Sequence, residues 1–162
     1  MNMKIYHGSL EVVEHPKILH PNRKLDYGEG FYTTTSEKQA REWVERRMIE
    51  NHSTCGYVNM YEFDDGMLPE FKSLIFSEPD EDWAEFVMAN RTKNGFSHDY
   101  DIVYGPVAND RVYLQFGLYE AGAISVETLI RELKTYNLVD QYLFHTERSL
   151  EALCFIGTTK IE

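Results

Sequence analysis

Apolar side chains recur along this chain with two kinds of spacing, one typical of strands and one typical of helices. Met3–Tyr6 and Phe31–Thr35 are short runs rich in β-branched and aromatic residues, a composition typical of strands. Tyr57–Phe63 alternates apolar with polar positions, which is the period of a half-buried strand. By the same criteria we expect further strands at Phe71–Phe76, Asp101–Tyr104, Gln141–His145 and Leu153–Ile156.

Between these predicted strands, apolar residues recur at the spacing of a helix. Ser36 followed by Gln39 is a capping box, because each side chain can bind a backbone N–H of the first turn. The helix that follows should run to about Glu50, and it carries four apolar residues on one face: Ala40, Trp43, Val44 and Met48. We expect further helices after Asp80, after Asn109 or Asp110, after Ser125 and after Thr146.

Strands and helices are mixed without a regular βαβ rhythm, and this pattern predicts an α+β fold rather than a doubly wound sheet. The chain has 162 residues and contains no repeat, no low-complexity tract and no Gly/Ser-rich linker. Its length suits one compact domain, so residues 1–162 are expected to form a single domain.

The charge balance narrows the function classes. Sixteen Lys and Arg against 27 Asp and Glu give a net charge of −11, which argues against tight nonspecific binding of nucleic acid. No apolar run approaches the ~20 residues of a membrane span, and the N-terminus lacks an apolar signal core. Cys55 and Cys154 do not suggest a disulfide framework, so a reducing cytoplasm is the simplest compartment.

Common catalytic patterns are absent from the sequence. It has no phosphate-binding Gly-rich loop, no dinucleotide fingerprint, no nucleophile elbow and no zinc-protease helix. None of the six histidines pairs with another His or a Cys at ligand spacing, which argues against a metal site.

Three separated segments combine residue types suited to ligand binding. In Tyr6–Ser9, His7 ends a strand and is followed by Gly8 and Ser9. In Gly28–Tyr32, two glycines permit close backbone approach before a strand that carries Tyr32. Asp140–Phe144 is a late strand with one amide, Gln141. Taken singly, each segment is also explained by ordinary structure: a capped strand end, a turn before a core tyrosine, and an exposed strand position.

Taken together, the segments resemble the ADP-ribosyltransferase superfamily, in the branch of diphtheria toxin and the poly(ADP-ribose) polymerases. In that family a first strand carries His-Gly, a second region reads Gly-x-Gly-x-Tyr, and a late strand carries Glu-Tyr. The corresponding residues here are His7-Gly8, Gly28–Tyr32 and Gln141-Tyr142. The resemblance implies a split, mainly antiparallel sheet with flanking helices, and NAD as substrate without a metal.

The resemblance also implies roles for individual residues. His7, Tyr32 and Gln141 would form the catalytic triad, with His7 bonding an adenosine-side ribose hydroxyl. The Gly8 backbone would bond the nicotinamide carboxamide, while Tyr32 and Trp43 would sandwich its ring. Three further residues are assigned to NAD binding: Ser9, Gly30 and, at the pyrophosphate, Arg23 (or Lys24). The helix serine that bonds the carboxamide in the family aligns with Ala40 and is missing. We expect His7, Gly8, Tyr32, Trp43 and Gln141 to meet in one cleft.

The segment Asp101–Arg111 extends the likeness to a small stand-alone bacterial family of unknown function placed in this superfamily. Members of that family are suspected in part to be toxins that act beside a small antitoxin protein. This context is implied by the resemblance alone.

Gln141 leaves the function open between three interpretations. A glutamine keeps the hydrogen bond of the usual Glu but loses its charge, and removing one such electrostatic contact typically costs ~10²–10³ in rate. The chain is then an enzyme that transfers ADP-ribose to a macromolecule, either slowly or with another acid in compensation (Glu29 and Asp140 are the nearest in sequence), or a silent NAD- or ADP-ribose-binding module. The third interpretation is a protein-interaction domain, which exposed apolar residues on the helix Val112–Tyr119 would favour.

Overall fold

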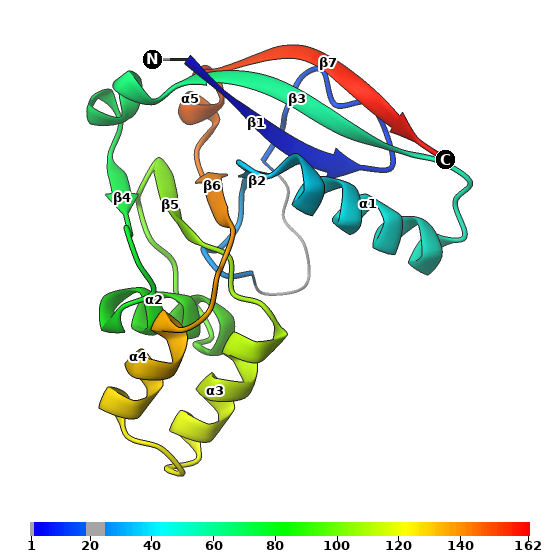
Figure 1. The fold of residues 1–162 in the computed structure, drawn as a ribbon. Coiled ribbons are helices and arrows are strands. Elements are labelled where there is room, and N and C mark those ends of the chain that lie inside the picture. Colours follow the sequence, from blue (N-terminus) through cyan, green and yellow to red (C-terminus); the bar gives the residue numbers. More distant parts are fainter. Residues whose placement is uncertain (1, 19–24) are drawn as a thin grey trace.

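The computed structural model describes residues 2–18 and 25–162. Seven strands form one sheet in the order β4-β5-β6-β2-β1-β3-β7 (Figure 1). Only β4 and β5 are parallel, and the other neighbours are antiparallel. The α+β prediction is therefore confirmed. The strand bounds are β1 Asn2–Ser9, β2 Phe31–Thr34, β3 Gly56–Asp64, β4 Ser73–Ile75, β5 Ile102–Pro106, β6 Asp140–Phe144 and β7 Leu153–Ile161.

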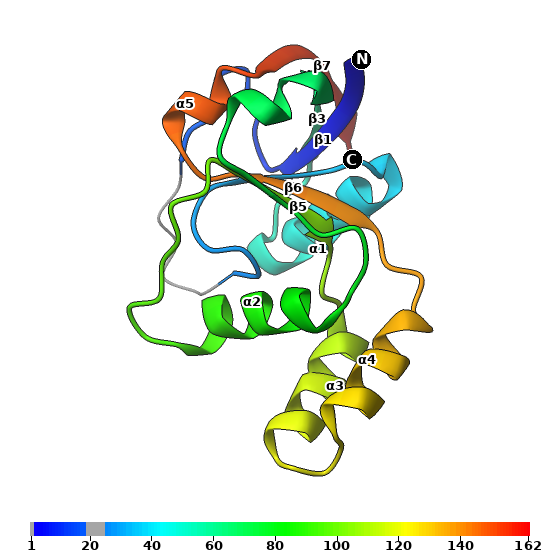
Figure 2. The same cartoon turned by 90° about the vertical axis from the view of Figure 1, so that its left-hand side faces the viewer.

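The helices flank this sheet. Figures 1 and 2 show α2 lying below the strands, with α3 and α4 extending away from the sheet, while α1 lies along β1. Among the described residues, no helix combines the length and the apolar character that crossing a membrane requires. The helix bounds are α1 Glu37–Asn51, the 3₁₀ helix η1 Asp65–Glu70, α2 Glu81–Thr92, α3 Asp110–Glu120, α4 Val126–Lys134 and α5 Glu147–Leu150.

Two hydrophobic clusters share one face of the sheet. Val103 and Leu143 pack with α2, α3 and α4 around Trp83, while Val58 packs with Ala40 of α1. The opposite face carries a third, aromatic cluster that includes Phe31, Phe63 and Phe144. Because successive strand residues point to opposite faces, this division fixes which side chains of β1, β2 and β6 can meet.

Most helix starts agree with the sequence. Ser36, Asn109 and Ser125 each accept a hydrogen bond from a backbone N–H three residues on, as expected of N-caps. The capping box at Ser36 is only half formed, because its backbone N–H binds Thr34 Oγ1 at 3.0 Å.

The last strand is longer than predicted. We expected it to end at Ile156, but β7 continues to Ile161 and pairs with β3 as far as Gly56. Gly157, with φ at +155°, sits opposite a register shift at Met60 and Tyr61. Pairing with β3 therefore extends β7 past Gly157, a residue that by local sequence alone predicts the end of a strand.

Candidate functional site

The sheet order brings the three singled-out segments together. β1, β2 and β6 are adjacent, and Tyr6, Thr34 and Gln141 form one cross-strand row. β1 and β2 share only the ladder pair Tyr6 with Thr34. Segments more than 100 positions apart in the sequence thus become neighbours at the centre of the sheet.

His7 links β1 to β2. Its Nδ1 lies 2.7 Å from the Tyr32 carbonyl oxygen, which can only accept, so Nδ1 carries the proton. Its ring stacks on Phe31 with centroids 4.2 Å apart. Burial lowers the pKa of His7 to about 4, against the opposing effect of the Tyr32 hydrogen bond. The imidazole is therefore neutral near pH 7, with Nε2 as an acceptor.

Gly8 faces α1. A Cβ at this position would lie 2.6 Å from Val44 Cγ2, 2.8 Å from the Ala40 carbonyl oxygen and 3.5 Å from Trp43 Cε3. The close approach of α1 therefore accounts for the glycine. It also places the half-buried Trp43 next to Gly8, where the Arg47 guanidinium lies 5.2 Å from its ring centroid.

Tyr32 uses its hydroxyl to close the turn that precedes β2. The hydroxyl donates to the Gly28 carbonyl at 2.5 Å and accepts from the Tyr27 N–H at 3.0 Å. Burial raises the pKa of Tyr32 well above its ordinary value. Tyr32 is half-buried, and its side chain packs against the cluster around Trp83.

The same turn is held by two histidines. His98 Nε2 lies 2.7 Å from the Tyr27 carbonyl, and His145 Nδ1 lies 2.5 Å from the Glu29 carbonyl. The two rings are 4.2 Å apart. Gly30 at the end of the turn, with φ at +150°, has no space for a Cβ, which would lie 2.5 Å from the Phe144 carbonyl. Packing of β6 thus accounts for Gly30.

Gln141 is buried and faces a carboxylate that sequence reasoning missed. Its Nε2 donates to Asp26 Oδ2 at 3.2 Å and to the Pro106 carbonyl at 3.3 Å. Glu29 and Asp140, the two acids that the sequence suggests as compensating acids, do not occupy the position of Asp26. Glu29 is exposed, and Asp140 accepts from the Tyr104 hydroxyl at 2.5 Å.

Asp26 is the centre of a buried polar cluster. Its Oδ2 also accepts from the Ala108 N–H at 3.1 Å, while its Oδ1 accepts from the Tyr113 hydroxyl and lies 3.6 Å from Arg91 Nη1. Burial raises the pKa of Asp26 and outweighs the hydrogen bonds and the Arg91 charge that lower it. The sequence offered no signal for this residue, because all of these partners lie far from it along the chain.

The predicted site residues divide between the two faces of the sheet. Gly8, Tyr32 and Gln141 face the side that carries α1 and α2. His7 stacks on Phe31, which belongs to the aromatic cluster on the other side. The expected meeting of all five residues in one cleft is therefore corrected: the His7 ring contacts only the main-chain carbonyl of Tyr32, because strand alternation turns the ring to the other face.

Of the remaining predicted site residues, Ser9 alone lies within the described part of the chain. Ser9 Oγ accepts from the Glu11 N–H at 3.2 Å and closes a turn after β1. Arg23 and Lys24 lie outside the described residues. Within residues 2–18 and 25–162, no group of three or more His, Cys, Asp or Glu side chains is placed to hold a metal ion.

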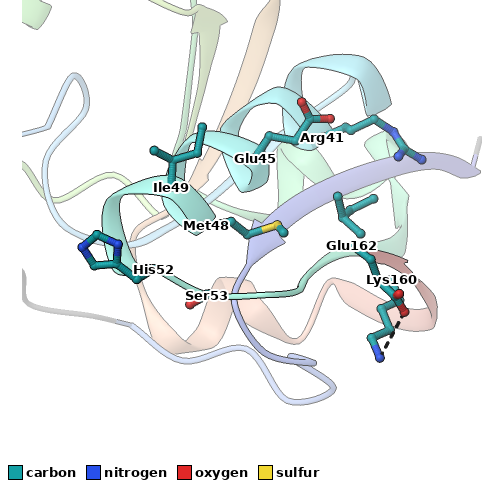
Figure 3. A pocket seen from close by; sticks show the side chains of 9 residues that line it. Arg41, Glu45, Met48, Ile49, His52, Ser53, Lys160 and Glu162 are labelled. Carbon is teal, nitrogen blue, oxygen red and sulfur yellow. Dashed lines mark ion pairs between the residues drawn. The ribbon is translucent and has the colours of Figure 1, made fainter.

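A groove of about 740 Å³ lies elsewhere, between the second half of α1 and the end of β7 (Figure 3). None of the predicted site residues that the structure describes lines it. Its lining residues are Arg41, Glu45, Met48, Ile49, His52, Ser53, Lys160, Ile161 and Glu162.

Comparison with known protein families shows where this chain belongs. A family described as a protein of unknown function (DUF3990) matches residues 3–155. No curated protein and no solved structure is significantly similar. The expectation of a family of unknown function agrees with this match, which carries no statement about activity.

Proposed function

Because this chain belongs to the DUF3990 family, whose function is unknown, we propose a function for it from its own site: an ADP-ribosyltransferase-like protein that binds NAD and transfers ADP-ribose to a macromolecular target in the cytoplasm. The observation that carries the proposal is the adjacency of β1, β2 and β6, which gathers the three segments that resemble this superfamily.

The residues on the α1 face suit such a substrate. Trp43 beside Gly8 and the ring of Tyr32 offer aromatic surface to a flat nicotinamide, and stacking contributes ~0.5–1.5 kcal/mol per pair. Gln141 offers an amide to a ribose hydroxyl. The His7 ring lies on the other face, fixed to the Tyr32 carbonyl, and supports the site by holding β1 to β2.

The test is a pair of measurements on one preparation: NAD affinity by calorimetry and nicotinamide release with or without a cell lysate. Gln141→Ala should weaken both, because it removes the amide. Gln115→Ala on α3 is the matched control and should change neither. Undetectable NAD binding at millimolar concentration by the wild-type chain would refute the proposal. Binding without nicotinamide release would identify a silent NAD- or ADP-ribose-binding module instead.

A second candidate is a protein-interaction domain, which includes a toxin held by a small antitoxin. Leu114 and Leu118 favour it, because these residues one helical turn apart on α3 are 64% and 37% exposed. Co-expression with small proteins encoded beside this chain tests it. Leu114→Ser with Leu118→Ser should abolish co-purification, whereas Ile156→Ser on β7, which also removes an exposed apolar side chain, should not.

A further inference from the structure

The orientation of the Gln141 amide is fixed by its partners. Nε2 lies 3.2 Å from Asp26 Oδ2 and 3.3 Å from the Pro106 carbonyl oxygen, and both of these atoms are acceptors. The NH₂ group must face them, because a carbonyl oxygen in its place would meet two other oxygens. This arrangement directs Oε1 away from the carboxylate.

Asp26 is itself held rigidly. Its two oxygens bind groups from three further segments: the Ala108 N–H, the Tyr113 hydroxyl and the Arg91 guanidinium. The carboxyl group is buried, and it receives the Gln141 N–H bond in surroundings where hydrogen bonds polarise one another. This hydrogen bond polarises the amide and shifts electron density toward Oε1, which makes Oε1 a stronger acceptor than the oxygen of an unpaired glutamine.

We propose that Asp26 is a positioning residue that orients and polarises Gln141, so that the pair provides the acceptor for a ribose hydroxyl of NAD that a glutamate would otherwise provide. This inference rests on the proposed function. In the reaction, the bond between ribose C1′ and the nicotinamide nitrogen breaks, nicotinamide leaves with the electron pair, and the nucleophile bonds to C1′ and loses its proton. When Asp26 is ionised, its negative charge behind Gln141 stabilises the positive charge that develops on the ribose.

The structure also indicates what a glutamate at position 141 would do. Its carboxylate would face that of Asp26 across about the 3.2 Å now spanned by a hydrogen bond. Two buried carboxylates at that separation share a proton, since both cannot stay ionised. Gln141→Glu alone should therefore not increase nicotinamide release. If Asp26 were ignored, the added negative charge would predict an increase in this rate.

Exchanging the Asp26 carboxylate and the Gln141 amide separates the effect of the negative charge from the effect of its position. Asp26→Asn keeps the shape of the side chain and removes the charge. It should lower the rate constant for nicotinamide release at least about tenfold while NAD affinity changes less than about threefold. Asp26→Asn combined with Gln141→Glu restores an amide facing a carboxylate, and should recover the rate to the wild-type level or above. Asp99→Asn, an exposed carboxylate paired with Lys72, is the matched control and should be silent.

A second measurement does not depend on NAD. Hydrogen exchange of the Gln141 side-chain NH₂, followed by NMR, should be slow in the wild-type chain and accelerate at least about tenfold in Asp26→Leu, which offers no acceptor. Asp26→Asn and Asp99→Asn should keep the protection, the first because its amide oxygen still accepts. Thermal melts of all variants establish that they are folded.

The outcomes separate the inference from the proposed function. A wild-type chain that neither binds nor cleaves NAD ends the proposed function, whereas protection lost in Asp26→Leu would still establish that Asp26 orients Gln141. Unchanged protection in a folded Asp26→Leu overturns the positioning role. Nicotinamide release by Asp26→Asn at the wild-type rate overturns the role of its charge.

Discussion

Two glycines of the site are required by their neighbours in the fold. Gly8 lies under α1, where an added Cβ would come within 2.8 Å of both Val44 and the Ala40 carbonyl, and Gly30 lies against β6 with φ at +150°. Gly117 differs from both, because it is helical and nothing lies within 4 Å of its Cβ position. The comparison separates a glycine held by packing from one that is merely tolerated.

Gly8→Ala should lower the free energy of unfolding by about 1–3 kcal/mol, because α1 must shift to admit the methyl group. Gly117→Ala is the control, and it should raise that free energy by about 0.5–1 kcal/mol, because alanine favours a helix. Urea unfolding followed by circular dichroism measures both. Equal stability of Gly8→Ala and the wild-type chain would show that α1 does not pack as closely as described.

The stability of the chain should depend on the protonation of His7. Burial holds the pKa of His7 at about 4 in the folded chain, against 6.5 when it is exposed. Between these values the unfolded chain binds a proton that the folded chain does not, so stability falls as pH falls through this window. Burial lowers the pKa of His98 as well, with the same sign.

Replacing His7 should therefore flatten the pH dependence of stability. The wild-type unfolding free energy should fall between pH 7 and pH 4 by more than that of His7→Gln, and the difference should be on the order of 3 kcal/mol. Urea titrations at several pH values measure it. Asp26 contributes with the opposite sign because its pKa is raised, but its effect cancels between the two chains. Parallel pH profiles would contradict the neutral state of the half-buried His7.

Among the secondary-structure elements, the junction between β2 and α1 depends on one hydroxyl. Thr34 Oγ1 donates to the Asp140 carbonyl of β6 at 3.0 Å and accepts from the Ser36 N–H, also at 3.0 Å. One side chain thus ties the helix start, its own strand and the strand that carries Gln141.

Thr34→Val should cost about 1–3 kcal/mol of stability, because it keeps the shape of the side chain but leaves two polar groups on half-buried residues without this partner. Thr92→Val is the control, since the Thr92 hydroxyl binds the Met88 carbonyl on an exposed part of α2, and it should change stability by less than about 0.5 kcal/mol. Urea unfolding of both variants measures the difference. Similar losses in the two would show that the hydrogen bonds at the junction add no particular stability.

Across the whole chain, the sheet joins all of the described parts. Neighbouring strands come from distant positions, as with β2 beside β6 and β3 beside β7. Trp43 lies in α1 over β1, and Trp83 lies in α2 in the largest cluster, so each reports on a different end of the same face.

We expect the chain to unfold as one cooperative unit. The fluorescence of Trp43→Phe reports on Trp83, and that of Trp83→Phe reports on Trp43. In each variant, the tryptophan signal and circular dichroism should give the same urea midpoint. A tryptophan transition that precedes the loss of helix and strand signal would show that the α1 end and the α2 end of the sheet unfold separately.

Local elements and the fold class could be predicted from the amino-acid sequence. Ser36 and Ser125 are predicted as caps, and Asn109 as one of two candidates, because the bonds of a cap span only three residues; strand periodicity is equally local. The end of β7 was missed, since Gly157 is a break by local criteria and only pairing with β3 continues the strand.

The composition of the site could not be predicted in this way, because it depends on tertiary contacts. Asp26 and Gln141 are 115 positions apart, and nothing in either local sequence indicates that they bind each other. The same holds for His7, whose residue type was recognised but whose direction depends on the register between β1 and β2. Local hydrogen bonds are specified by nearby residues, whereas contacts across a sheet depend on strand order and register, which the packing of the whole chain sets.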